Sequence, residues 1–400
     1  MSVRPSPAGA IPGTVVALGF VSLFMDVSSE MIHSLLPVFL VSGLGASALS
    51  VGIIEGIAEA TASITKVFSG VVSDWVGRRK PLLLLGYGMA ALTKPVFPLA
   101  DSLGTVLLAR FLDRIGKGVR GAPRDALVAE VTPVELRGAA FGLRQSMDTV
   151  GAFAGPALAM LLMLLSGGDV RLVFWVAVIP AMVAVAVIVV GVREPDAEPS
   201  AEKRRFPIRR SELRQLDGHY WGIVALASAL TLARFSEAFL LLRAQSVGVE
   251  DAYAPLVLIV MNIVYAASAY PLGRLADRLD RRTLLAVGVG LLVLADLVLA
   301  AAGSVWAVLA GSAAWGLHMG ATQGLLAVFV ADAAPKHLRG TAFGLYSLVT
   351  GLALLAASAL AGALWTAAGP AATFLAGAGF SVLSLVGLLM LVPGKTEAGA

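Results

Sequence analysis

The sequence predicts an all-α integral membrane protein, with twelve transmembrane helices in two pseudo-symmetric six-helix bundles and both termini cytoplasmic. Three observations predict this fold class: an apolar composition, a series of membrane-length apolar runs, and two halves that resemble each other. Hydrophobic residues make up 58% of the 400 residues and charged residues only 14%, and the mean hydropathy is +0.86. A composition this apolar excludes an ordinary soluble domain.

Twelve apolar runs are long enough to cross the bilayer, because about 20 helical residues span a hydrocarbon core about 30 Å thick. The first is too long for a cleaved signal peptide and lacks its flanking sequences. The predicted spans are residues 14–42, 48–73, 81–100, 103–128, 138–166, 171–192, 219–247, 252–275, 283–301, 304–331, 340–367 and 369–392.

Basic residues lie in alternate connections between these spans and fix the orientation. One set of connections holds Arg78, Arg79, Lys80, Arg137, the loop 193–218, Arg278, Arg281, Arg282, Lys336 and Arg339. The other set, residues 43–47, 101–102, 167–170, 248–251, 302–303 and 368, contains no Lys or Arg. Because positively charged loops stay in the cytoplasm, we expect a multi-pass protein of the inner (cytoplasmic) membrane.

The loop 193–218 divides the predicted helices six to six. We therefore expect an N-terminal bundle over residues 1–192, a cytoplasmic linker over 193–218 and a C-terminal bundle over 219–400. The linker carries both signs of charge and three prolines, so it is either a solvated tether or in part an amphipathic helix on anionic lipid.

Two loop sequences return about 200 residues later, which is the signature of a chain built from repeats. Gly70-x-x-x-Asp74-x-x-Gly77-Arg78-Arg79 returns as Gly273-x-x-x-Asp277-x-x-Asp280-Arg281-Arg282, 203 residues on. The segment 133–142 returns as 335–344, at an offset of 202.

These residues carry a family resemblance. The loop 70–79 resembles the signature that follows the second helix in the major facilitator superfamily, and Arg110 resembles the fourth-helix arginine of that family. Gly142, Gly151, Gly155 and Pro156 reproduce the spacing of its fifth-helix antiporter motif. The chain departs from the family pattern at Ala159-Met160, where the motif closes with two glycines, and at Arg114, where a glycine is expected.

The resemblance, to twelve-helix proton-coupled antiporters, implies a central cavity lined largely by the first, fourth, seventh and tenth helices, and alternating access by rocking of the two halves. The loops then form a cytoplasmic latch between the halves, in which glycines permit tight turns and Asp74 accepts hydrogen bonds. The alternative is that they are positively charged loops with a capping Asp. The latch residues are Gly70, Asp74, Gly77, Arg78, Arg79, Gly273, Asp277, Arg281 and Arg282.

Ionisable residues inside the predicted spans indicate where function lies. A charged side chain at mid-bilayer costs about 2.5–3.5 kcal/mol, so these groups must line water or pair with one another. Asp26, Glu30 and His33 recur on one helix face, and a charged stripe on span 103–128 predicts a wetted face. The predicted coupling and pathway residues are Asp26, Glu30, His33, Glu55, Glu59, Arg110, Asp113, Arg114, Lys117, Arg144, Asp148, Arg234 and Glu237.

The internal repeat compares the two halves directly. Shifting span 103–128 by 202 residues sets Ser312, Trp315, Gly316, Met319 and Thr322 at the positions of Arg110, Asp113, Arg114, Lys117 and Arg120. This loss of charge indicates that coupling or substrate binding belongs to the N-terminal bundle. We expect His318 to pack or hydrogen-bond, and Lys94 and Asp296 to snorkel and pair locally.

We therefore expect a secondary active transporter that uses a proton gradient, favouring efflux by antiport of a small molecule such as a drug, metabolite or metal chelate. One alternative is a proton symporter that imports an anionic solute bound by Arg110, Arg114 and Lys117. Another is a non-transporting membrane receptor or sensor. We expect no enzyme activity, no cofactor, no resident metal and no nucleic-acid partner, because the sequence has neither a phosphate-binding loop nor a nucleophile–base arrangement. A monomer would contain the complete pathway.

Overall fold

The computed structural model describes residues 11–76, 78–194, 216–276, 280–335 and 338–391. Within these ranges every regular element is an α-helix or a short 3₁₀ or π turn, and no strand occurs. The predicted all-α fold class is confirmed for this part of the chain.

Ten helical segments among the described residues are long and apolar enough to cross a membrane. The predicted spans 103–128 and 304–331 are not among these ten. The helices at these places, α6 (Leu103–Val131) and α14 (Val305–Ala333), have 29 residues each, and α6 carries many charges. The number twelve and the cytoplasmic side of both termini stay predictions.

The chain forms two compact units, which we call the N-terminal and C-terminal units. The N-terminal unit comprises residues 1–33 and 61–205, and the C-terminal unit comprises 34–60 and 206–400. Residues 34–60 pack with the second unit because glycines admit close contact there: a Cβ atom on Gly52 would lie 2.1 Å from the carbonyl oxygen of Ser358. The predicted bundle boundaries at the linker stay a prediction.

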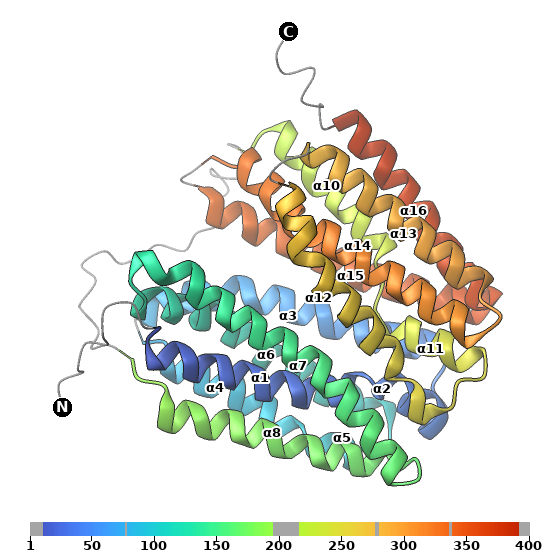
Figure 1. The fold of residues 1–400 in the computed structure, drawn as a ribbon, viewed down its shortest axis with the longest axis horizontal. Helices are drawn as coiled ribbons and strands as arrows, with labels where there is room; N and C mark the ends of the chain where they lie inside the picture. Colours follow the sequence, from blue (N-terminus) through green and yellow to red (C-terminus); the bar gives the residue numbers. More distant parts are fainter. Residues whose placement is uncertain (1–10, 77, 195–215, 277–279, 336–337, 392–400) are drawn as a thin grey trace. The chain divides into compact units, whose positions relative to one another are not determined.

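The N-terminal unit is a bundle around α1 (Gly13–His33), which packs between α7 (Arg137–Leu165) and α8 (Val170–Gly191) (Figure 1). Its core joins apolar side chains of α1, α4, α6 and α8. The other elements are the second part of α3 (Ala48–Val76), α4 (Lys80–Thr93), α5 (Val96–Leu99), α6 and the 3₁₀ turn η2 (Val134–Leu136).

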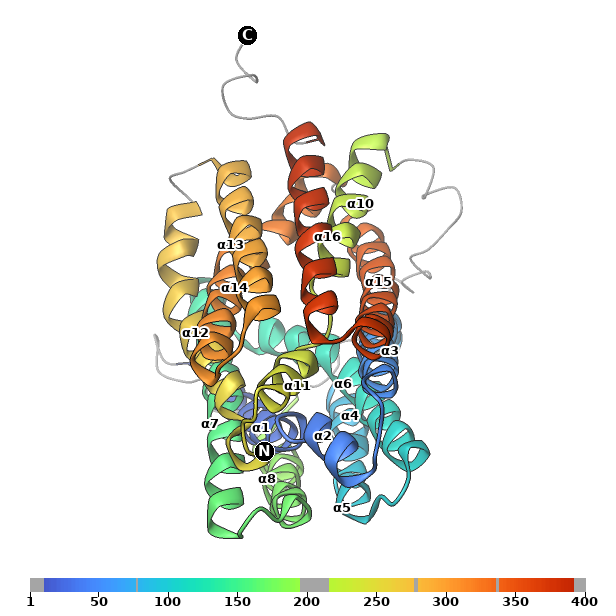
Figure 2. The same ribbon diagram turned by 90° about the vertical axis from the view of Figure 1, so that its right-hand side faces the viewer.

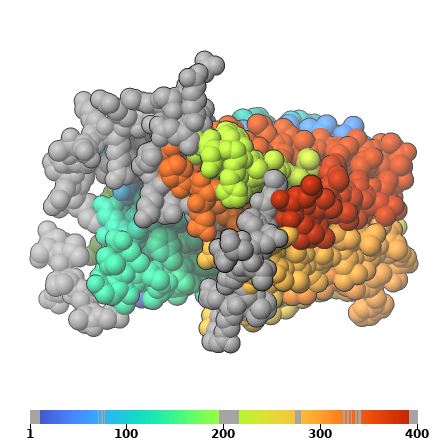
Figure 3. Space-filling model, turned by 90° about the horizontal axis from the view of Figure 1, so that it is seen from above, coloured from blue at the N-terminus to red at the C-terminus, as the bar shows by residue number. Residues whose placement is uncertain are grey.

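In the C-terminal unit, α14 packs between α12 (Leu256–Ala276) and α13 (Arg281–Ala301), as Figure 2 shows. Helices α10 and α16 contact each other, and both lie on the face shown in Figure 3, in yellow-green and red. The remaining elements are α2 (Leu36–Val38), the π turn η1 (Phe39–Gly43), the first part of α3, α10 (Gly218–Ala233), α11 (Ala238–Ser246), the 3₁₀ turn η3 (Asp251–Tyr253), α15 (Arg339–Ala368) and α16 (Pro370–Leu391).

Three spans predicted as continuous helices are interrupted. Span 14–42 breaks after His33 and resumes at α2, where Pro37 occupies the first turn. Span 81–100 breaks at Lys94 and Pro95, between α4 and α5. Proline lacks a backbone N–H and is favoured in the first turn of a helix, which agrees with both restarts. The third break, at residues 234–237 between α10 and α11, has no proline.

The internal repeat is visible in the contacts as well as in the sequence. The Ser102 side chain caps α6, accepting from Thr105 N–H at 3.2 Å, and Ser304 caps α14 in the same way, accepting from Ala307 N–H at 3.4 Å. Serine at this position satisfies one of the free N–H groups of the first helical turn. The two serines are 202 residues apart, so the halves share local capping as well as loop motifs.

Candidate functional site

The acidic face of α1 lies directly against the glycines of α7 in the N-terminal unit. A Cβ atom on Gly151 would lie 2.8 Å from Cβ of Asp26, and one on Gly155 would lie 2.5 Å from Cβ of Glu30. Real Cβ atoms do not approach so closely, so only glycine lets the two helices meet here. The antiporter-like spacing therefore matches the spacing of the two acids.

The other two residues of that motif have different surroundings. Pro156 is buried inside α7, whereas a Cβ atom on Gly142 would meet nothing within 4 Å. The structure thus brings Gly151 and Gly155 to the acids of α1 and leaves Gly142 in open space.

Replacement of Gly155 by Leu should force α1 and α7 apart. We expect a loss of about 1–3 kcal/mol in the free energy of unfolding, the usual cost of overpacking, measured by thermal unfolding in detergent. Gly142→Leu is the matched control on the same helix and should leave the unfolding temperature within error. Equal unfolding temperatures for the two variants would contradict the packing described here.

A network of charges connects α1, α6 and α7 beside Asp26. Arg144 Nη1 lies 2.9 Å from an Asp148 carboxylate oxygen and 3.7 Å from Asp125 Oδ1. Arg124 Nη1 donates to Ser22 Oγ on α1 at 2.8 Å and lies 3.9 Å from the other Asp148 oxygen. Asp26 lies in the electrostatic field of Asp148 and of Arg124. The acid of α1 thus lies in the field of Arg124, which Asp148 already contacts.

Glu30 forms a second level of this site, one helical turn along α1. Its carboxylate oxygen lies 3.3 Å from Nδ1 of His33, and it lies in the electrostatic field of Lys117 and Arg114. Among the described residues, no group of three or more His, Asp or Glu side chains is arranged to hold a metal ion. We refer to Asp26, Glu30, Lys117, Arg124, Asp125, Arg144 and Asp148 as the charged network.

Lys94 does not snorkel, contrary to the sequence-based expectation. Its ammonium group lies 2.9 Å from Asp113 Oδ1 and donates to Ser29 Oγ at 3.1 Å. Lys94 is 1% exposed and Asp113 4%. The break between α4 and α5 places Lys94 inside the unit, where a charge needs a counterion because water cannot solvate it. Asp113 is therefore held in a buried ion pair.

The charged stripe of α6 is not one wetted face. Arg120 is 6% exposed, with its guanidinium 4.4 Å from the centre of the Tyr87 ring on α4, a cation–π contact. Asp113 also points to the α4–α5 break, whereas Arg124 contacts α1 and α7. Lys117 is exposed, and Arg110 and Arg114 are buried. Helical spacing placed these charges on neighbouring faces, but different helices cover those faces.

The remaining predicted pathway residues lie in the C-terminal unit. Glu55 is fully buried in α3 and Glu59 is half-buried one turn further on. Arg234 and Glu237 flank the break between α10 and α11. Arg234 lies in the electrostatic field of Glu237, Tyr265 and Tyr346. The structure thus places this group apart from the charged network, in a different unit.

Two arginines of the predicted latch, Arg79 and Arg281, form ion pairs inside their own units. Arg79 Nε lies 2.8 Å from Glu130 at the end of α6, and Arg281 Nη1 lies 3.1 Å from Asp332 at the end of α14. Both members are shifted by 202 residues, which is the offset of the segment 133–142 and one less than that of the loop 70–79, so the ion pair recurs in the second half. The latch between the halves stays a prediction.

Other latch residues have simpler surroundings. Arg282 donates to the Leu389 carbonyl at 2.8 Å, Arg78 is exposed, and a Cβ atom on Gly70 would meet Ala122 at 3.6 Å. Gly273 has open space beside it. Gly77, Asp277 and the side chain of Asp74 lie outside the described residues.

Sequence reasoning missed three parts of the site. Neither Asp125 nor Arg124 is among the site residues predicted from the sequence, and Lys94 is expected there to snorkel rather than to lie inside the unit. The signal for Lys94 was present in the repeat, because Asp296, its partner 202 residues on, is also ionisable. His318 matches its expectation, since its Nδ1 lies 2.7 Å from the Gly288 carbonyl oxygen.

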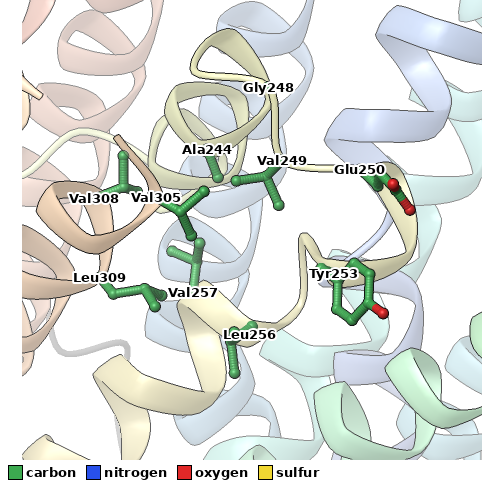
Figure 4. A pocket seen from close by; sticks show the side chains of 10 residues that line it. All are labelled: Ala244, Gly248, Val249, Glu250, Tyr253, Leu256, Val257, Val305, Val308 and Leu309. Atoms are coloured by element: carbon green, nitrogen blue, oxygen red, sulfur yellow. The ribbon is translucent and has the colours of Figure 1, made fainter. Parts of the chain in front are cut away.

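An apolar pocket of about 290 Å³ lies in the C-terminal unit at the first residues of α12 and α14 (Figure 4). Aliphatic side chains of α12 and α14, among them Val257 and Val308, form its walls, and Glu250 and Tyr253 lie at its rim. Its size is at the lower end of the range for small-molecule pockets.

Comparison with known proteins decides the family. The sequence model of the Major Facilitator Superfamily matches residues 18–243 and 223–399. An uncharacterized MFS-type transporter of Methanocaldococcus jannaschii is 33% identical over 384 residues, which cover 94% of each chain. This chain belongs to the Major Facilitator Superfamily. It is accordingly a multi-pass membrane transporter and not an enzyme.

More distant relatives agree with this membership. An uncharacterized protein of Mycobacterium tuberculosis is 27% identical over 356 residues, covering 88% of this chain and 86% of that protein. A crystal structure of a variant of the nucleoside transporter NupG superposes with a TM-score of 0.82 at 12% identity, over 95% of this chain and all of that one. At such low identity the structural likeness shows the shared fold alone.

Proposed function

We propose that this protein is a proton-coupled exporter that exchanges protons for a small organic molecule across the cytoplasmic membrane. The observation that carries the proposal is the position of Asp26 and Glu30. Both acids pack against Gly151 and Gly155 and belong to the charged network. Acids inside a membrane bundle are costly, and they mark proton relays in many transporters. With both termini cytoplasmic, the α3–α4 and α12–α13 loops face the cytoplasm.

The network offers a mechanism by which a proton changes the structure. When Asp26 is protonated, it does not compete for the arginines. Arg124 and Arg144 then form ion pairs only with Asp148 and Asp125. When Asp26 loses its proton, the new carboxylate competes with Asp148 for Arg124. Because Arg124 also binds Ser22 on α1, this exchange shifts α1 against α6 and α7. Protonation and the packing of the bundle are thereby linked.

Two further observations support export and the kind of substrate. The multidrug resistance protein MdtH of Proteus mirabilis is 28% identical over 162 residues, a partial match that covers 40% of this chain and 37% of that protein. The apolar walls of the pocket in Figure 4 fit an apolar organic molecule better than an anion. Together with the antiporter-like spacing on α7, they favour efflux over import of an anionic solute.

The test is transport by the purified protein in liposomes. A thermal-shift screen across cations, anions and common antibiotics supplies the probe, and its uptake is followed under imposed pH gradients of both signs. We expect the probe to accumulate only on the side from which protons leave. Accumulation on the side that protons enter would indicate a symporter, and binding without any flux would indicate a receptor.

A further inference from the structure

A carboxyl group is buried without a partner in the C-terminal unit. Asp296 of α13 is fully buried, and neither of its carboxyl oxygens has a hydrogen-bond partner among the described residues. Buried polar groups in folded proteins are nearly always hydrogen-bonded. The expectation that Asp296 snorkels and pairs locally is therefore wrong, because its side chain reaches neither the surface nor a hydrogen-bond partner among the described residues.

The internal repeat explains what Asp296 lacks. Asp296 occupies the position of Lys94 in the first half, and Trp315 occupies the position of Asp113, each 202 residues on. In the N-terminal unit these positions form the Lys94–Asp113 ion pair. In the C-terminal unit an acid has replaced the cation and an indole has replaced its counterion. The N-terminal unit neutralises its buried charge by pairing, whereas no described cation pairs with Asp296 in the C-terminal unit.

The surroundings of Asp296 are apolar and closely packed. A Cβ atom on Gly377 of α16 would lie 2.8 Å from Asp296 Oδ2 and 3.0 Å from the ring of Phe235. Phe235 belongs to the break between α10 and α11, and its ring lies 5.5–5.6 Å from the rings of Phe239, Trp315 and Phe374. The Asp296 carboxyl group therefore lies close to Phe235 of the α10–α11 break and next to the aromatic cluster that Phe235 joins.

Among the side chains that the structure describes, no charged group of the packed helices is paired with Asp296. Helix α16 contains no titratable residue. His318 of α14 meets α13 at Gly288, about two turns from Asp296. Arg243 of α11 meets the end of α13, but its donors go to the carbonyls of Leu299, Ala300 and Ala302 and to the Ser246 side chain. Arg234 lies in the field of Glu237, Tyr265 and Tyr346.

An ionised carboxylate cannot persist in such a place without water or a cation. We propose that Asp296 is a proton-binding site, and that its protonation holds Phe235, and with it the break between α10 and α11, in the conformation described here. Release breaks the carboxylic O–H bond: the proton passes to water and the carboxylate keeps the electron pair. The new charge must then be hydrated, which requires Phe235 to move aside and the break to open.

This inference rests on the proposed function only in taking the proton as the coupling ion. The proton site itself belongs to the C-terminal unit and does not involve Asp26 or Glu30. It also revises the comparison of the two halves, because the second half retains an ionisable group, Asp296, at the position of Lys94.

The chain contains no cysteine, so a single introduced cysteine can report on the break. Ser236→Cys places the reporter at a buried position in the break, and a maleimide measures its exposure as pH rises. We expect labelling to rise several-fold more in the otherwise wild-type protein than in Ser236→Cys with Asp296→Asn, which mimics the protonated acid. Both curves contain the thiol's own response to pH, so their difference isolates Asp296.

The controls separate this site from the rest of the mechanism. Asp332→Asn makes the same change in an exposed acid of the same unit, and Asp26→Asn removes the proposed coupling acid; both should keep the wild-type labelling curve. Ser304→Cys gives the pH dependence of an exposed thiol. A Ser236→Cys curve no steeper than that reference overturns the proposal without any Asp296 variant, as do identical curves with and without Asp296→Asn.

Infrared spectroscopy gives a second measurement. The carbonyl stretching band of a protonated carboxylic acid should lose intensity in Asp296→Asn and keep it in Asp332→Asn. A band that is unchanged in Asp296→Asn would show that Asp296 carries no proton and would overturn the proposal. Failure of pH-driven transport, in contrast, would overturn the proposed function and leave this site intact.

Discussion

Lys94→Ala should lower the free energy of unfolding by about 3–5 kcal/mol, because removing one member of a buried ion pair leaves the other charge without compensation. The carboxylate that loses its counterion is Asp113, which is 4% exposed and accepts a hydrogen bond from Lys94 at 2.9 Å. The measurement is chemical or thermal unfolding in detergent, followed by circular dichroism. Lys66→Ala, at an exposed lysine of the same unit, should change stability by at most about 0.5 kcal/mol.

A double variant distinguishes the ion pair from simple packing. Lys94→Met combined with Asp113→Leu replaces both charges by apolar groups, and such replacements are often neutral or stabilising. We therefore expect the double variant to recover most of the stability that Lys94→Ala loses. An additive loss in the double variant, or no loss in Lys94→Ala, would contradict the buried ion pair.

Asp26→Asn should abolish pH-driven accumulation of the transported probe while leaving its downhill exchange in place. The amide keeps the shape of the side chain against Gly151 but cannot release a proton, so Arg124 no longer has a competing partner to Asp148. The measurement compares uptake under a pH gradient with counterflow in the same proteoliposomes.

Asp101→Asn is the matched control for Asp26→Asn. Asp101 pairs with Arg171 in the same unit, and its side chain is 86% exposed, so both activities should match the wild type. Full accumulation by Asp26→Asn would remove this acid from the mechanism, whereas loss of counterflow as well would assign it to binding or folding.

The fold class was predictable because membrane helices are recognised in a sequence by their length and apolar composition, and because the two halves of the chain share loop sequences. The offset of 202 residues found in the loops returns in the paired contacts Arg79–Glu130 and Arg281–Asp332. Helix breaks were less accessible. Pro37 and Pro95 signal two of them, but the break at Arg234 follows from tertiary packing and has no local signature.

The sequence identified most residues of the charged site, but it did not predict how these residues are arranged in space. Helical periodicity identified Asp26 and Glu30 as neighbours, and Arg144 with Asp148 as an i, i+4 pair at 2.9 Å. It could not tell which neighbouring helix each charge of α6 faces, because that depends on how α4, α1 and α7 surround it. The partners of Lys94 and the isolation of Asp296 are properties of packing, visible in sequence only through the repeat.

The most direct test of the account is proton movement driven by the transported probe. Proteoliposomes that contain a pH-sensitive dye receive a gradient of the probe with no initial pH difference, and the dye reports the direction of proton flow. Proton antiport through Asp26 predicts that protons flow opposite to the probe in the wild type and that no proton flow occurs in Asp26→Asn. Proton flow in the same direction as the probe, or undiminished opposite flow in the variant, would contradict the claim that this protein is a proton antiporter coupled through the acids of α1.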